Sequence, residues 1–198
     1  MAVKMISPPA TYPVTVAQAK AHLRVVDDDE DALIELLLAS ATRHAEQFLG
    51  RRLIDQTLEL TLDEFPLNEI KIPYPPLIEV VSIAYDDGDG NEQTLSTGEY
   101  TVDNVSQPGW VVPVSSGSWP TTFAGINAVR IRYRAGYLDE TSSPPVANVE
   151  HDIVAAILLT LGSLYAHRET VVIGVSATSL PWGAEQLLRL HRIDMSMA

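Results

Sequence analysis

Apolar residues recur at helical spacing in two stretches near the start of the chain. Thr15 precedes the first stretch and Gln18 stands three residues later, which is the spacing of a capping box. A short helix is therefore predicted to about Arg24. A second helix follows the acidic run at 27–31, because carboxylates favour the positive end of a helix, and Gly50 is placed to end it. Its predicted apolar positions are Ile34, Leu37, Ala41, Ala45, Phe48 and Leu49.

The hydrophobic period changes to two from Leu53 onward. Leu58, Leu60 and Leu62 alternate with polar residues, which predicts a strand with one buried face. Turn clusters rich in Pro, Asp and Gly separate the further candidates for strands, at 69–72, 77–85, 93–95, 100–102, 110–114 and 128–134. Connections this short favour antiparallel pairing in a small sandwich or barrel.

Helical spacing returns after the pair Pro144-Pro145. A third helix is predicted from there to about His167, with apolar residues on one face. Residues 169–183 have the composition of a loop, and Ala184–His191 is predicted as a last short helix. Helices therefore bracket a β segment, and the pattern as a whole is typical of an α+β protein.

Charge and composition exclude several classes of function. The formal net charge is −13, and residues 53–135 carry most of the acidic excess. Tight binding of nucleic acid is not expected, because that affinity comes largely from Lys and Arg that displace counterions. The chain has no cysteine, so disulfides, zinc fingers and thiol nucleophiles are excluded. We see no apolar run long enough for a secretory signal or a membrane span, and we expect no membrane partner.

No set of residues indicates catalysis or metal binding. Asp87, Asp89 and Asn91 have the spacing of the first three ligands of a calcium loop, but Glu92 and Gly98 stand where the turn glycine and the bidentate glutamate belong. We interpret this segment as a solvated hairpin turn. The histidines lie singly along helical segments, and the motifs of hydrolases, NTPases and dinucleotide-binding enzymes are missing. The sequence predicts no catalytic residue, no metal site, no cofactor and no enzyme.

Three arginines alternate with apolar residues near the end of the β segment. Arg130, Arg132 and Arg134 are predicted on one face of a strand. A stripe for nucleic acid is one interpretation. Pairing with carboxylates such as Glu59 and Asp63, within the sheet or between subunits, is the interpretation we favour, because the same segment is rich in acidic residues.

The order of the segments resembles that of phage head-tail connector proteins. VTVAQAKAHLRV at 14–25, DDDEDALI at 27–34 and AEQFLGRRLIDQT at 45–57 are similar to the start of these proteins. The resemblance continues through IKIPYPPLIEVVSIAYDDGDG, EYTVD, SSGSWP, VRIRYRAGYLD and SPPVANVEHDIVAAILLTLGSLYAHRE, up to residue 169. These later segments look like the rest of the longer members of the family, which include the adaptors of gene transfer agents.

The resemblance implies a fold, a location and partners. The fold class is α+β, a bundle of roughly four helices with an inserted antiparallel β domain. The predicted helical core is 1–52 with 136–168, and the inserted β domain is 53–135. The implied function is a structural adaptor in the virion neck, assembled in the cytoplasm of a bacterial host. Its implied partners are the portal protein, a tail, stopper or tail-terminator protein, and further copies of itself in a ring of roughly a dozen.

Residues 169–198 are predicted to form a docking arm that ends in a short helix. Their apolar residues have no evident partner in the pattern of the chain, and a helix this short is not stable alone. The candidates for docking on the portal or the tail are Val171, Val172, Ile173, Leu180, Trp182, Leu187 and Leu188.

Two other functions stay open at this point. Trp110, Trp119 and Trp182 could make the β segment a carbohydrate- or peptide-binding module, because exposed indole rings stack on sugars and on partner chains. The chain could also be a different neck or tail-completion protein of the same kind of particle.

Overall fold

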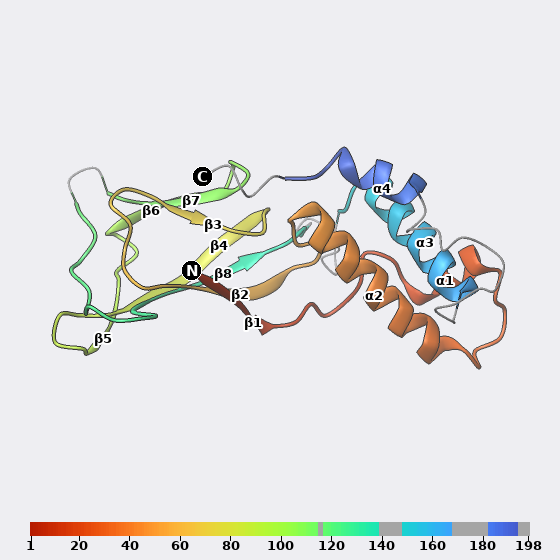
Figure 1. Ribbon diagram of the computed structural model, residues 1–198, viewed down its shortest axis with the longest axis horizontal. Helices are drawn as coiled ribbons and strands as arrows, with labels where there is room; N and C mark the ends of the chain where they lie inside the picture. The colour runs from red at the N-terminus through yellow and green to blue at the C-terminus, as the bar shows by residue number, and fades with distance from the viewer. Residues whose placement is uncertain (115–116, 139–147, 168–181, 194–198) are drawn as a thin grey trace. The chain divides into compact units, whose positions relative to one another are not determined.

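The computed structural model describes residues 1–114, 117–138, 148–167 and 182–193, and it divides into two compact units (Figure 1). The β unit contains Met1–Ala10 and the segment that starts at Ile54. The helical unit contains Thr11–Leu53 and the segment that starts at Asn148. Four helices and two antiparallel sheets make the described chain an α+β protein, as the hydrophobic pattern predicts.

Two antiparallel sheets form the β unit. The larger has the strand order β1-β2-β8-β4-β5 and the smaller the order β3-β7-β6. The strands are β1 Ala2–Ser7, β2 Gln56–Leu62, β3 Ile70–Ile72, β4 Leu77–Asp86, β5 Glu92–Thr94, β6 Tyr100–Asp103, β7 Gly109–Pro113 and β8 Val129–Ala135. All strand pairs run antiparallel. Every strand except those at the sheet edges has a hydrogen-bonded neighbour on each side.

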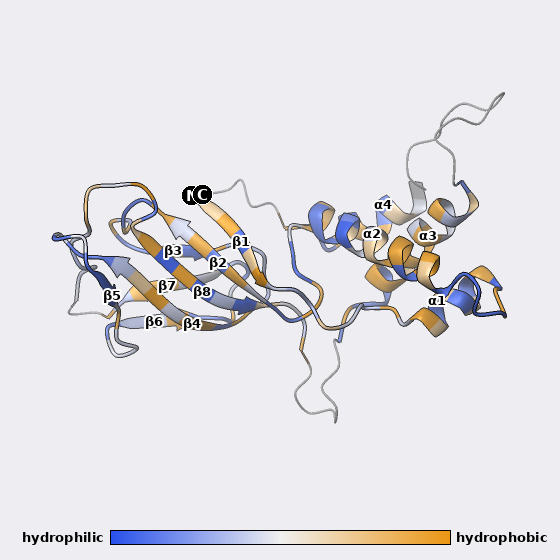
Figure 2. Cartoon of the chain, turned by 90° about the horizontal axis from the view of Figure 1, so that it is seen from below, coloured by the Kyte–Doolittle hydropathy of each residue, from blue (hydrophilic) through white to orange (hydrophobic). Residues whose placement is uncertain are grey.

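The two sheets share one hydrophobic core. Strand β8 alternates strictly, and its apolar residues Val129, Ile131 and Tyr133 are fully buried, while its arginines lie on the opposite face. Figure 2 shows the same alternation of apolar and polar residues along the strands of the β unit. The Tyr133 hydroxyl donates to the carbonyl of Pro73 at 3.1 Å, so its one polar atom is satisfied inside the core. Burial of the apolar face therefore fixes which face of β8 carries charge.

The N-terminal strand is a correction to the sequence analysis. Residues 1–52 were all assigned to the helical part, but Ala2–Ser7 pairs with β2 as the edge strand β1. Only Val3 of this strand is half-buried, and the other residues are exposed. The segment therefore lacks the strong alternation by which a strand is recognised, and its long-range partner is what makes it one.

The helical unit consists of α1 Val16–Leu23, α2 Asp31–Leu49, α3 His151–Ala166 and α4 Trp182–Arg189. The capping box is present as predicted: the N–H of Gln18 donates to the Thr15 hydroxyl, and the N–H of Thr15 donates to the Gln18 side chain. Gly50 ends α2 with a positive φ of 67°. The buried face of α2 contains Leu38 in place of the predicted Leu37, which is half-buried together with Phe48.

The described C-terminal helix packs within the chain's own helical unit. Leu188 of α4 is only 1% exposed. Beyond α4, the N–H of Ile193 donates to the carbonyl of Leu49 at 2.9 Å, and Nε of Arg51 donates to the carbonyl of His191 at 2.9 Å. Residues 191–193 thus satisfy one of the free carbonyl groups at the end of α2.

Replacing Leu188 by Ala should lower the free energy of unfolding by about 2–5 kcal/mol, because it leaves a cavity in the helical core. Urea unfolding followed by circular dichroism measures this. The matched control is Leu190→Ala, since Leu190 is 74% exposed, and it should change the free energy by less than about 0.5 kcal/mol. Equal effects of the two substitutions would mean that α4 does not pack as described.

Candidate functional site

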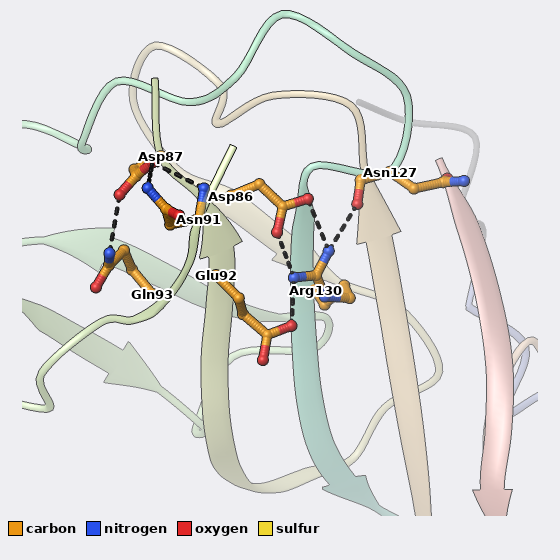
Figure 3. A network of polar contacts seen from close by, with 7 residues as sticks. All are labelled: Asp86, Asp87, Asn91, Glu92, Gln93, Asn127 and Arg130. Carbon is orange, nitrogen blue, oxygen red and sulfur yellow. Dashed lines mark hydrogen bonds and ion pairs between the residues drawn. The ribbon is translucent and has the colours of Figure 1, made fainter. Parts of the chain in front are cut away.

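The outer face of the larger sheet carries a row of ion pairs centred on β8. Arg130 donates to both carboxylate oxygens of Asp86, at 2.7 and 3.2 Å, and to Glu92 at 2.7 Å (Figure 3). Its Nη1 also donates to the carbonyl of Asn127 at 3.1 Å. The partners come from β4, from β5 and from the loop before β8. One guanidinium therefore ties the ends of three chain segments together.

The other two arginines are paired in the same way. Arg132 donates to Glu59 on β2 at 2.8 Å. Arg134 holds Asp55 with two bonds, from Nε at 3.1 Å and from Nη2 at 2.6 Å, and donates to Glu79 on β4 at 2.6 Å. Across the row, three guanidiniums meet five carboxylates, and the row as a whole is acidic.

These pairs shift the ionisation of the groups that form them. The hydrogen bond from Arg130 holds the pKa of Asp86 below its usual value, and the hydrogen bond to Asp86 raises the pKa of Arg130. The pKa of Arg134 is raised by its hydrogen bonds to Asp55 and Glu79. In each of these three groups the hydrogen bonds favour the charged form, so the pairing stabilises the ionic row.

The row contains the three arginines and Glu59 of the predicted ionic face, but it lacks Asp63 and includes four other carboxylates. Glu59 pairs with Arg132, but Asp63 lies beyond the end of β2 and accepts the backbone N–H of Asn127 at 2.9 Å. The carboxylates of Asp55, Glu79, Asp86 and Glu92 were not predicted. Strand register decides which acidic residues stand opposite an arginine, and the sequence alone does not reveal register.

The acidic turn after β4 is closed by its own hydrogen bonds. One carboxylate oxygen of Asp87 accepts hydrogen bonds from the backbone N–H groups of Asp89 and Asn91, each at 3.0 Å. The other accepts a hydrogen bond from Nε2 of Gln93 at 2.8 Å, and Figure 3 shows the contacts of Asp87 with Asn91 and Gln93. The bond from the Asn91 backbone is the largest cause that lowers the pKa of Asp87. Among the described residues, no group of three or more acidic or histidine side chains could hold a metal ion. The geometry is that of a turn organised by an aspartate.

The tryptophans of the β unit are used inside the chain. The ring of Trp119 stacks on Phe65 with centroids 5.0 Å apart and planes at 4°, and its Nε1 donates to the carbonyl of Asn68 at 2.8 Å. The Lys71 ammonium lies 5.9 Å from the centre of the Trp110 ring. Each of the two indole rings thus contacts another side chain of the same chain on one face. This arrangement does not favour a sugar-binding role for the two rings. The side chain of Trp182 lies outside the described residues.

The predicted docking residues fall in different places. Val171, Val172, Ile173 and Leu180 lie outside the described residues. Leu187 is half-buried on α4, and Leu188 belongs to the helical core. A docking role for this segment stays a prediction, and Leu188 reaches a partner only if α4 leaves its own unit.

Exposed apolar side chains gather on loops that the sequence analysis did not single out. Leu67 is 98% exposed, Ile126 is 84% exposed and Phe123 is 49% exposed. They lie on the loops 63–69 and 117–127, which together with the turn 86–92 we call the loop end of the β unit. The only signal in the sequence is that apolar residues stand beside turn residues, and this alone does not separate exposed from buried positions.

The ion pairs of the β8 row join strands of the β unit to one another. Residues 13–106 match the model of the family of phage gp6-like head-tail connector proteins. This match confirms the resemblance to phage head-tail connectors that the sequence shows. None of the curated proteins matches the chain in sequence.

Solved structures share the fold over almost the whole chain. A chain from the neck of an empty GTA particle, computed with C6 symmetry, is 19% identical, with a TM-score of 0.78 over 97% of this chain and 95% of that one. A chain from the virion of a native gene transfer agent (GTA) particle is 20% identical, with a TM-score of 0.77 and the same coverage. A chain from the neck of a native GTA particle, computed with C12 symmetry, is 21% identical, with a TM-score of 0.65 over 95% of each chain. At these identities the likeness establishes the fold.

Within the described residues, no helix is long and apolar enough to cross a membrane.

Replacing Asp86 by Asn should change how stability depends on pH. Because the folded-state pKa of Asp86 lies below its unfolded value, its stabilising effect is complete above that value, near pH 4, and is lost as the pH falls through the folded value. The difference in melting temperature between the protein and Asp86→Asn should therefore be largest at neutral pH and shrink below about pH 4. Asp89→Asn, at an exposed position in the neighbouring turn, is the matched control and should give a smaller difference. A difference in melting temperature between the protein and Asp86→Asn that stays constant with pH would contradict the ion pair.

Proposed function

We propose that the protein is a head-tail connector subunit, which forms a ring in the neck of a phage or phage-like particle between the portal and the tail. The observation that carries this proposal is the family match, which spans α1, α2 and the strands β2 to β6 and so includes parts of both units. The fold shared with chains of GTA particles over nearly the full length supports it.

A closed ring is the part of the proposal that concerns assembly. Two of the similar structures come from necks computed with C6 and C12 symmetry, which favours a cyclic arrangement of roughly a dozen copies for this chain as well. The partners on either side would be the portal protein and a tail, stopper or tail-terminator protein. Assembly would take place in the cytoplasm of a bacterial host, and the function requires no cofactor and no catalysis.

Duplex DNA would pass through the ring without being held. The net charge of −13 repels phosphates, and a channel lined by free Lys and Arg would retain them. The three arginines of β8 are already paired with carboxylates, so binding DNA there would require breaking those pairs. The ionic row therefore supports a passage with low affinity.

Electron microscopy of particles that contain this chain tests the proposal. We expect ring-shaped density for the chain between the portal and the tail. Deleting the chain should yield heads without attached tails. Density for the chain elsewhere in the tail would favour the alternative of another tail-completion protein, and its absence from particles would refute the proposal.

The isolated protein should not bind duplex DNA measurably at physiological salt, about 0.15 M. Fluorescence anisotropy with a labelled duplex measures this. As a comparison, a variant with Asp55→Asn, Glu79→Gln, Asp86→Asn and Glu92→Gln removes the carboxylate partners of Arg130 and Arg134 and should gain weak binding that falls steeply with salt. Micromolar binding by the unaltered protein with a steep salt slope would show that the arginine row holds phosphates.

A further inference from the structure

The loop end of the β unit combines exposed apolar side chains with a mainly acidic surrounding. Leu67, Phe123 and Ile126 supply the apolar surface. The three loops that form it contain no Lys, Arg or His, and Asp63, Glu64, Glu69 and Asp89 are exposed. Arg130 at the border is neutralised by Asp86 and Glu92, so the unbalanced charge of the loop end is negative. An apolar patch that is rimmed by charge of one sign is typical of a surface that binds a partner of the opposite sign.

The loops of the loop end are fixed to one another. The N–H of Phe123 donates to the carbonyl of Asp86 at 2.9 Å, and Asp87 and Thr122 form an isolated β-bridge. The stack of Phe65 on Trp119 joins the other two loops and borders a shallow, open hollow of about 330 Å³ beside Leu67. The apolar side chains are therefore presented by a preorganised surface, which lowers the cost of binding.

The helical unit carries a surface rich in arginine, where α2 and α4 end. Leu190 is exposed there, and the Arg192 guanidinium lies 5.5 Å from the centre of the Phe48 ring. Arg189 is exposed and lies 3.9 Å from Glu185, and the carboxylates of Glu150 and Asp152 lie beside His191 at the border of this surface. We call this surface, made of Phe48, Arg51, Arg189, Leu190 and Arg192, the basic end. It too has apolar side chains beside charged ones.

We propose that the loop end of one copy docks on the basic end of a second copy. The exposed leucines, Leu67 and Leu190, would lie in an apolar centre, and the acidic rim of one surface would face the arginines of the other. The two surfaces differ, so the contact is heterologous and repeats from copy to copy until a ring closes. This contact rests on the proposed ring and names the surfaces that form it.

Cysteine cross-linking tests the contact directly, because the chain has no cysteine of its own. A protein with both Leu67→Cys and Leu190→Cys, treated with a short bismaleimide, should give a ladder of covalent oligomers in purified protein or in particles. Either substitution alone should give no species beyond a dimer. The matched control pairs Leu67→Cys with Leu36→Cys, a leucine on α2 that is 63% exposed against 74% for Leu190, and should give no ladder.

Charge reversal provides an independent readout. Glu64→Arg with Asp89→Lys should reduce cross-linking of the cysteine pair several-fold, and so should Arg189→Glu with Arg192→Glu. The two sets combined should restore it, because the opposite signs then face each other again. Glu35→Lys, an exposed reversal on α2 apart from both surfaces, should leave it unchanged.

The outcomes separate this contact from the proposed function. A ladder with recovery in the combined variant supports the contact. Rings seen at the neck without the ladder would overturn the contact and leave the connector function standing. A ladder without recovery, or cross-links only to another neck protein, would also overturn it. Absence of the chain from particles would refute the connector function. Cross-linking of the purified protein would then show whether copies bind one another through these surfaces.

Discussion

The strict alternation of β8 is the constraint on which the rest of the β unit depends. Because this strand is central in the larger sheet, its apolar residues must fill the core, and its arginines are then forced to the outer face. Strands β2 and β4 contribute carboxylates on that same face, and the register of each pair places them within hydrogen-bonding distance. The hydrophobic core and the ionic row therefore both result from the alternation of apolar and charged residues along β8.

The pairing of arginines with carboxylates on the sheet also affects which other molecules this surface can bind. The guanidiniums of Arg130 and Arg134, each engaged by two carboxylates, have few donors left for phosphates, and the five carboxylates leave the row acidic. The apolar side chains of Leu67, Phe123 and Ile126 on fixed loops, in contrast, remain exposed, and surfaces of that kind are where association with other chains is favoured.

The sequence predicts those parts of the fold that depend on local chemistry. Thr15 and Gln18 give the start of α1, Gly50 gives the end of α2, and the alternation at 129–134 gives β8, because in each case the signal lies within a few residues. Strand β1 was missed because its pairing with β2 spans about fifty residues and its own pattern is weak. The carboxylates of the ionic row were mostly missed for the same reason: Glu79 and Asp55 reach Arg134 only through strand register. Exposure of Leu67 and Ile126 depends on loop geometry, which short-range patterns do not determine.

The two-part origin of the helical unit has a consequence for synthesis on the ribosome. Helices α1 and α2 emerge first, yet their core is incomplete until α3 and α4 follow, after the whole segment of the β unit has been translated. At bacterial rates this interval is on the order of ten seconds. During that time the apolar face of α2 with Ile34 and Leu38 has no long-range partner from the later helices, while most of the β unit has its strands available to pair. The strands of the β unit from β2 to β8 are thus all available for pairing before the helical core has its full set of helices.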